Sequence, residues 1–153
     1  MSGIDACLAR AMAIHGAIGA SIVDHTTGFA IGARGRAPTD DPDATWSGTA
    51  AIVNVATTGS PFASTRPGDG IEDVIITTLD GYHLIQQVRT VFDSRLVLYL
   101  WLDRTQGNLA MARRQLRLLA EGLAGTPAPP DPAAASGPAR AAEPVASVPA
   151  ALG

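Results

Sequence analysis

Histidine and cysteine are the side chains in this sequence that most readily carry acid–base or metal chemistry. Three histidines, His15, His25 and His83, lie in separate predicted elements, and none has a second ligand at helical or hairpin spacing. Cys7 is the sole cysteine, so it forms no internal disulfide and supplies no structural zinc site by itself. It falls on the apolar side of a predicted helix, where a small buried hydrophobe is the simplest role. These residues predict no catalytic residues and no metal site.

Acidic residues and glycines are the next candidates for binding chemistry. Asp40, Asp41 and Asp43 cluster beside a proline in a predicted loop, but the ligand spacing and central glycine of a calcium-binding EF-hand are missing. Three glycines precede them: Gly28, Gly32 and Gly35. The lysine of a phosphate-binding loop and the dinucleotide fingerprint are both absent from the sequence. We therefore predict a protein that is not an enzyme, takes no cofactor and does not itself bind nucleotide.

The composition excludes several classes of partner. The 153 residues carry a formal net charge of −3, and all 11 basic residues are arginines. This mildly acidic, dispersed charge predicts no nucleic-acid surface and no amphipathic helix for an anionic membrane. The start of the chain lacks the features of a secretory signal, and the longest apolar stretches are too short to span a bilayer. The expected location is the cytoplasm.

The composition changes abruptly near residue 125. Beyond it the chain is almost entirely Ala, Pro, Ser, Gly and Val, with Asp131, Arg140 and Glu143 as the only charged residues. Such a segment has too few large apolar groups to offset the entropy lost on ordering. The prediction is one domain over residues 1–124, followed by a disordered Ala/Pro-rich tail over 125–153.

Hydrophobic periodicity divides the domain into helices and strands. A helix is predicted over residues 4–14, opened by a capping-box pattern from Ser2 to Asp5. The Asp80-Gly81 pair predicts a hairpin turn in the second half. The other predicted elements are strands over 17–24, 29–33, 71–78, 82–88 and 95–102 and a helix over about 105–123.

The segment Ala44–Thr58 is ambiguous by itself. Trp46, Ala50 and Val53 have helical spacing, whereas the threonines and β-branched residues of the segment favour a strand. The strand over 95–102 decides the matter, because it is apolar on both faces and must be covered on both. A helix over 44–58 would supply the second cover. The predicted fold is therefore α+β, in the order helix, two strands, helix, three strands, helix, with a largely antiparallel sheet between helices.

Four segments of the sequence occur in the order and spacing of a known family. They are Glu72–Thr78, Asp80–Ile85, Trp101–Arg104 and Gly107–Arg113. With them the chain resembles the roadblock/dynein light chain family over Ile4–Leu123. In subtype it is similar to bacterial members that accompany small Ras-like GTPases.

The resemblance implies a roadblock/profilin-like, five-stranded antiparallel sheet with the first and last helices on one face and the middle helix on the other. It also implies a homodimer, formed by pairing the edge strand Asp73–Thr78 with its symmetry mate and packing two middle helices together. An exposed apolar edge strand invites such pairing independently. The candidate interface residues are Trp46, Thr49, Val53, Asp73, Ile75 and Thr77.

The last predicted helix holds the only local basic group, Arg113, Arg114 and Arg117. Such a group is either a solvated helix face or a contact for an acidic partner, and we carry it as a candidate partner contact. The leading hypothesis is a non-enzymatic homodimeric adaptor that regulates a small Ras-like GTPase, either by activating it or as a scaffold. Two alternatives remain open: a small-molecule sensor module, and a structural dimerisation module that binds a helix or peptide.

Overall fold

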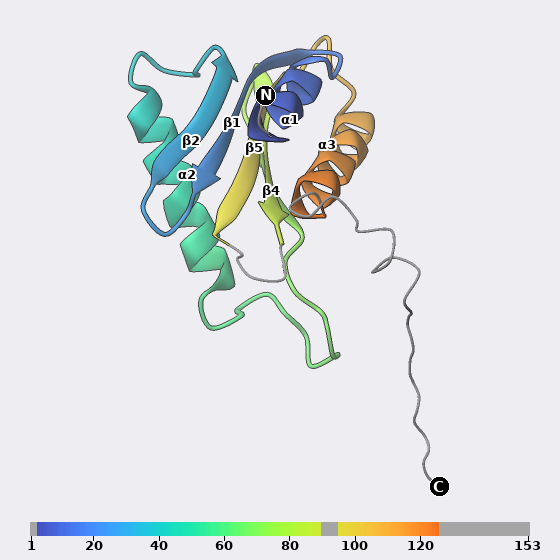
Figure 1. The fold of residues 1–153 in the computed structure, drawn as a ribbon. Helices are drawn as coiled ribbons and strands as arrows, with labels where there is room; N and C mark the ends of the chain where they lie inside the picture. The colour runs from blue at the N-terminus through green and yellow to red at the C-terminus, as the bar shows by residue number, and fades with distance from the viewer. Residues whose placement is uncertain (1–2, 90–94, 126–153) are drawn as a thin grey trace, which may run out of the picture.

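A computed structural model describes residues 3–89 and 95–125 of the chain (Figure 1). Three helices and five strands follow one another in the predicted order. They are α1 (Gly3–Met12), β1 (Ala17–Asp24), β2 (Phe29–Gly35), α2 (Pro42–Thr57), β3 (Asp73–Thr77), β4 (Gly81–Val88), β5 (Leu96–Asp103) and α3 (Leu109–Ala124). None of the helices in the described ranges is both long and apolar enough to cross a bilayer.

The five strands form one sheet in the order β2-β1-β5-β4-β3, and every neighbouring pair is antiparallel. β5 occupies the centre, between β1 and β4, as its apolar residues on both faces require. β2 and β3 are the two edges. The predicted five-stranded antiparallel sheet with helices on both faces is confirmed.

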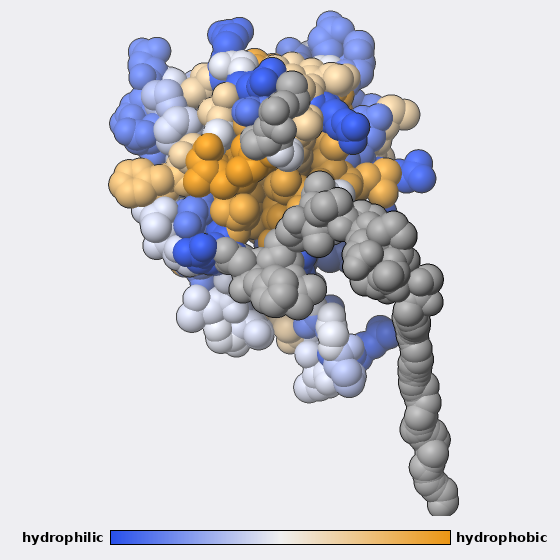
Figure 2. All heavy atoms as spheres, viewed as in Figure 1, coloured by the Kyte–Doolittle hydropathy of each residue, from blue (hydrophilic) through white to orange (hydrophobic). Residues whose placement is uncertain are grey.

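Each face of the sheet builds its own core. α1 and α3 cover one face, where Leu8, Leu98 and Leu116 are at most 1% exposed (Figure 1). Figure 2, drawn from the same side, shows apolar side chains gathered between these two helices. On the other face α2 packs mainly on β1 and β2, around Val23 and Val53. The half of that face formed by β3 and β4 is consequently less covered.

The ambiguous segment is helical because its packing outweighs its intrinsic preference. Thr49 and Thr57 each donate a 2.7 Å hydrogen bond to the carbonyl four residues earlier, so their hydroxyls are satisfied inside the helix. Pro42 stands in the first turn, where its missing N–H costs nothing. The buried side of α2 is formed by Thr49, Ala50, Val53 and Ala56.

The ends of some elements differ from the predicted ones for local reasons. α3 begins at Leu109 rather than near 105, because Asn108 caps it by accepting a hydrogen bond from the Met111 amide. The Asp103 carboxylate accepts the amides of residues 105 and 106 and so holds the preceding turn. The predicted hairpin turn is confirmed by the 2.8 Å hydrogen bond from the Thr78 amide to the Gly81 carbonyl. Ser2 and the segment 126–153, with the predicted tail, lie outside the described residues.

Candidate functional site

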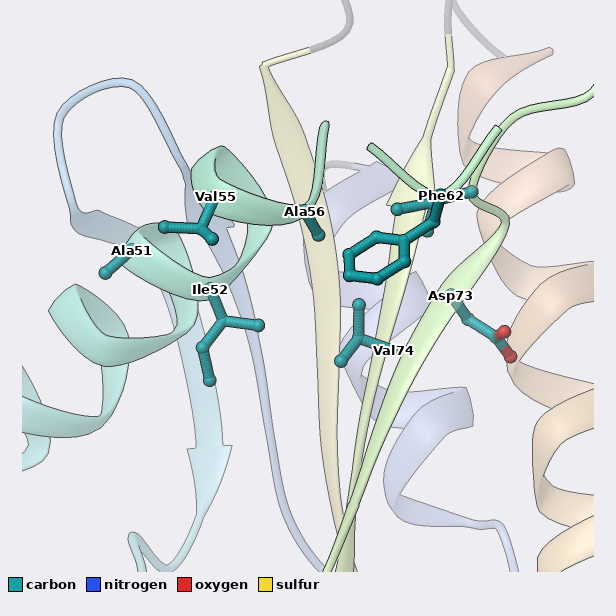
Figure 3. Close-up of a pocket in the computed structure, with 8 residues that line it drawn as sticks. Ala51, Ile52, Val55, Ala56, Phe62, Asp73 and Val74 are labelled. Atoms are coloured by element: carbon teal, nitrogen blue, oxygen red, sulfur yellow. The ribbon is translucent and has the colours of Figure 1, made fainter. Parts of the chain in front are cut away.

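An apolar groove runs between the C-terminal half of α2 and the start of the edge strand β3 (Figure 3). Its volume is about 580 Å³. We call it the α2–β3 groove and define it by its lining residues: Ala51, Ile52, Val55, Ala56, Phe62, Ile71, Asp73 and Val74. All but Asp73 are apolar, so the groove is suited to binding another apolar surface rather than to catalysis.

Large apolar side chains of the groove are open to solvent. Val55 and Phe62 are each 74% exposed, and Ile52 is 37% exposed. Figure 3 shows the Phe62 ring lying between α2 and β3, beside Ala56 and Val74. Phe62 comes from the long connection that follows α2, so this loop supplies one wall. A contiguous exposed apolar surface of this kind is typical of an interaction site or a ligand-binding groove.

The outward side of α2 is lined with small residues. Gly48 and Ala51 stand near Ile52 and Val55 at helical spacing, and all four are exposed. A Cβ placed on Gly48 would meet no atom of the described part of the chain within 4 Å. The backbone of α2 is therefore accessible to close approach by a second helix.

The structure places the three predicted interface residues of α2 differently. Trp46 is half-buried and packs against the core beneath α2. Thr49 and Val53 are only 4% and 2% exposed, because they face the chain's own sheet. A second chain could not reach them without unfolding the helix from its sheet. The exposed positions next to them are Ala51, Ile52 and Val55, which the sequence analysis does not name.

The three predicted interface residues of β3 do lie on an edge strand. Thr77 is exposed, whereas Ile75 is partly buried against the core under α1 and α3. Asp73 is turned away from the groove towards α3, as Figure 3 shows. The backbone of β3 has only β4 as a neighbour in the described sheet, through pairs such as Ile75 with Leu84.

The candidate partner-contact arginines fall into two kinds. Arg113 forms an ion pair with Asp73. The Arg113 Nε lies 2.5 Å from the Asp73 Oδ2, and the Arg113 Nη2 lies 3.1 Å from the Asp73 Oδ1. The hydrogen bond to Asp73 raises the pKa of Arg113 above its usual value. Arg114 and Arg117 are exposed. Arg117 borders a second hollow that also contains Glu72, Gln86 and Glu121. The structure thus brings together one predicted interface residue and one predicted contact residue.

His83 belongs to an aromatic cluster on the face of the sheet that α2 covers in part. Its Nδ1 lies 2.7 Å from the Tyr99 hydroxyl, and its ring stacks on Trp101 at 6.2 Å between centroids. Burial lowers the pKa of His83 and raises that of Tyr99. Both groups are therefore uncharged at neutral pH, as suits a packed cluster.

The remaining chemical candidates are dispersed. Within residues 3–89 and 95–125, no three His, Cys, Asp or Glu side chains come together as a metal site would require. Cys7 is buried, and its burial raises the pKa of the thiol. His25 faces Asn54, whose Oδ1 lies 3.0 Å from its Nδ1. The described residues thus offer surfaces for binding rather than a cluster of reactive side chains.

Comparison with known proteins identifies solved structures with the same fold. No family model matches the sequence, and no curated protein matches it significantly. Among solved structures, a roadblock/LC7 domain from Streptomyces avermitilis is 12% identical with a TM-score of 0.64, over 80% of this chain and 95% of that one. MglB from Myxococcus xanthus is 17% identical with a TM-score of 0.64, over 80% and 85%. The gliding protein MglB from Thermus thermophilus has the same identity and TM-score, over 80% and 86%.

Proposed function

Since the chain has the roadblock fold, we propose that it is a roadblock-family adaptor, a homodimer that binds a small Ras-like GTPase in the cytoplasm and regulates its cycle or its location. The observation that carries the proposal is the α2–β3 groove, an exposed apolar surface beside an unpaired strand edge. Such a surface is suited to protein–protein contact.

A second copy of the chain is the occupant that best fits the groove. Two β3 strands related by a two-fold axis can pair through their free edges and continue the sheet. The same axis would bring the two α2 helices together across the groove. The small residues Gly48 and Ala51 permit that approach, and Ile52 and Val55 would be buried by it.

The GTPase assignment rests on the fold together with the sequence resemblance. Two of the solved structures with this fold are MglB proteins, and the sequence resembles bacterial members that accompany small GTPases. The described residues contain no group of three His, Cys, Asp or Glu side chains that could hold a metal ion. An activating effect would then act by positioning the switch residues of the GTPase itself. Arg114 and Arg117, which are exposed on α3, are the proposed contacts for an acidic patch on the partner.

A tagged pull-down from native lysate tests the GTPase proposal. It is run once with GDP and once with a non-hydrolysable GTP analogue, and the captured proteins are identified by mass spectrometry. We expect a small GTPase enriched in one nucleotide state. The matched control is the Arg114→Glu/Arg117→Glu variant, which should retain the dimer and lose the GTPase. Absence of any GTPase in both nucleotide states would remove this assignment.

The exposed groove also favours a second function, a structural module whose groove binds an amphipathic helix of another protein in place of a second copy. Such a helix would place its apolar side on Ile52, Val55 and Phe62. Sedimentation of the pure chain separates the two cases. A concentration-dependent dimer supports the homodimer, and a monomer that captures a helical peptide supports the alternative.

A further inference from the structure

A third hollow lies at the other end of α2, where the helix begins. It has a volume of about 230 Å³ and is bounded by β1, β2, the segment after β2 and the first turn of α2. On the side formed by the strands, the small side chain of Ala33, which is paired with Ser21, leaves the space open. We call it the α2 N-terminal pocket.

The pocket is lined by a buried hydroxyl that has no partner. Ser21 is 2% exposed, and its Oγ makes no hydrogen bond to any of the described residues. Ser21 is paired across the sheet with Tyr99 on one side and Ala33 on the other, and all three line the pocket. Buried hydroxyls in folded proteins are nearly always hydrogen-bonded, so an unpaired one in the wall of a hollow is available to a ligand atom.

The charged residues that line the pocket indicate the charge of that ligand. Arg34 and Arg36 are the only charged residues among those that line the pocket in the described chain. The guanidinium carbon of Arg36 lies 6.0 Å from the centre of the Trp101 ring, so Arg36 extends over the same face as Ser21. The carboxylates of Asp40, Asp41 and Asp43 belong to the nearby loop and helix start but are not in the lining.

The first turn of α2 adds to this preference for an anion. Asp41 is the N-cap residue, but its side chain accepts no hydrogen bond from the helix. The cap carboxylate therefore does not occupy the amides of the helix start, where the helix dipole favours a negative charge. Asp43, the acidic residue of the first turn, is exposed and does not line the pocket. Pro42 and Thr45 of this turn form part of the wall.

The volume of the pocket and its apolar wall indicate the size of the ligand and the nature of its uncharged part. A pocket of about 230 Å³ is smaller than the roughly 300–1,000 Å³ typical of drug-sized ligands, so it is too small for a nucleotide. Trp46, Pro38 and Pro42 provide flat apolar surfaces. We propose that the α2 N-terminal pocket binds a small aromatic monocarboxylate, with its ring against Trp46 and its carboxylate directed to Arg36, the first turn of α2 and Ser21. This site is independent of the GTPase proposal.

Calorimetric titration of the full chain tests the site, with benzoate as the probe and benzamide as its neutral isostere. We expect saturable benzoate binding with a Kd of about 1 mM or tighter, and benzamide binding weaker by about tenfold. A rise in melting temperature with benzoate concentration gives a second readout. No binding of benzoate at about 20 mM would overturn the proposal, because even an inefficient ligand of this size should bind there. Equal binding of the two probes would overturn the preference for an anion.

Three variants locate the binding. Ser21→Ala and Arg36→Gln should each weaken benzoate by about tenfold, because each removes one polar contact. Ala33→Leu should abolish binding by filling the pocket. Ser47→Ala and Arg114→Gln are matched controls on exposed surfaces and should bind benzoate like the parent chain. Benzoate binding that none of the three pocket variants reduces would place it elsewhere and overturn the site.

Ser21→Ala also separates a binding role from a structural one. If the hydroxyl serves a ligand, the unliganded variant should melt at the same temperature as the parent or higher, because an unpartnered buried polar group has been removed. A clear drop in melting temperature without ligand would show that the hydroxyl stabilises the fold instead, and would contradict the proposal.

Discussion

Arg113 of α3 and Asp73 of β3, 40 residues apart in the sequence, form an ion pair in which both carboxylate oxygens accept hydrogen bonds. The pair ties the edge strand to the helix layer on one face of the sheet. Asp73 also lines the α2–β3 groove at the start of β3, although its carboxylate is directed towards α3. The contact therefore fixes the start of β3 beside the proposed dimer surface.

Replacing Arg113 with Gln should destabilise the fold by about 1 kcal/mol. Breaking a two-point pair costs more than the usual surface value, because the Asp73 side chain is only 12% exposed and loses its partner. The Arg113 side chain is 47% exposed, so solvent screening keeps the effect modest. Arg114→Gln, which changes the same charge next to it, should stay within about 0.5 kcal/mol of the parent in urea denaturation. Equal stabilities of the two variants would contradict a structural role for the pair.

Charges introduced on the outward side of α2 should abolish self-association. Val55→Asp and Ala51→Glu place a carboxylate where the second copy is proposed to pack, and an unpaired buried charge is strongly unfavourable. Because both positions are exposed in the single chain, each variant should remain folded by circular dichroism. Leu118→Asp, on the opposite side of the molecule, is the control and should sediment like the parent. Unchanged sedimentation of both α2 variants would rule out this interface.

His83 should make the stability of the protein depend on pH in the mildly acidic range. Burial lowers its pKa below the ordinary value of 6.5, so the unfolded chain takes up the proton more readily than the folded one. The contribution is thus fully present above pH 6.5 and is lost as the pH falls from 6.5 through the lowered folded-state pKa. His83→Gln should flatten the pH dependence of urea unfolding in this window. A parent and variant with parallel profiles would show that His83 is not responsible.

Gly107 and Gly122 should respond in opposite ways to alanine. A Cβ on Gly107 would lie 2.5 Å from the Leu102 Cγ and 2.7 Å from the Asp103 carbonyl oxygen. Gly107→Ala should therefore destabilise the fold by about 1–3 kcal/mol, as overpacking does. A Cβ on Gly122, inside α3, would meet no atom of residues 3–89 and 95–125 within 4 Å, so Gly122→Ala should stabilise the fold by about 0.5–1 kcal/mol. Thermal unfolding of both variants checks the signs.

Much of the fold was predictable because its signals are local. The two-sided apolar pattern of Leu96–Asp103 marks a central strand, and this in turn requires a second helix layer over it. That argument predicts α2 correctly even though the intrinsic preference of its residues is divided. The turn at Asp80-Gly81 likewise follows from the residue types alone.

The orientation of α2 was not predictable in the same way. Val53 and Val55 are both apolar and two positions apart, so they lie on different sides of the helix, and periodicity alone does not say which side faces the sheet. Thr49 resembles a surface residue, but its hydroxyl is satisfied by the helix backbone and its methyl group is buried. The exposed Gly48 was the available signal, since a glycine in mid-helix costs about 1 kcal/mol relative to alanine and so points to a packing or functional role.

Contacts between segments that are far apart in the sequence were also not predictable from it. The Arg113–Asp73 pair depends on α3 crossing the sheet beside its edge strand, which no spacing in the sequence expresses. The α2 N-terminal pocket depends on small residues of two strands lying opposite one helix turn. Both follow from the three-dimensional path of the chain rather than from the residues taken singly.

The central position of β5 has a consequence for folding during translation. β1 leaves the ribosome long before β5, its neighbour in the sheet, because some 70 residues separate Asp24 from Leu96. At about 5–20 residues per second this delay lasts roughly 4–14 s. During that interval the edge of β1 that later pairs with β5 is unpaired. The apolar residues of the first hairpin then need protection from other nascent chains. Translation speed across this interval, and the chaperones present, therefore bear on the yield of folded protein.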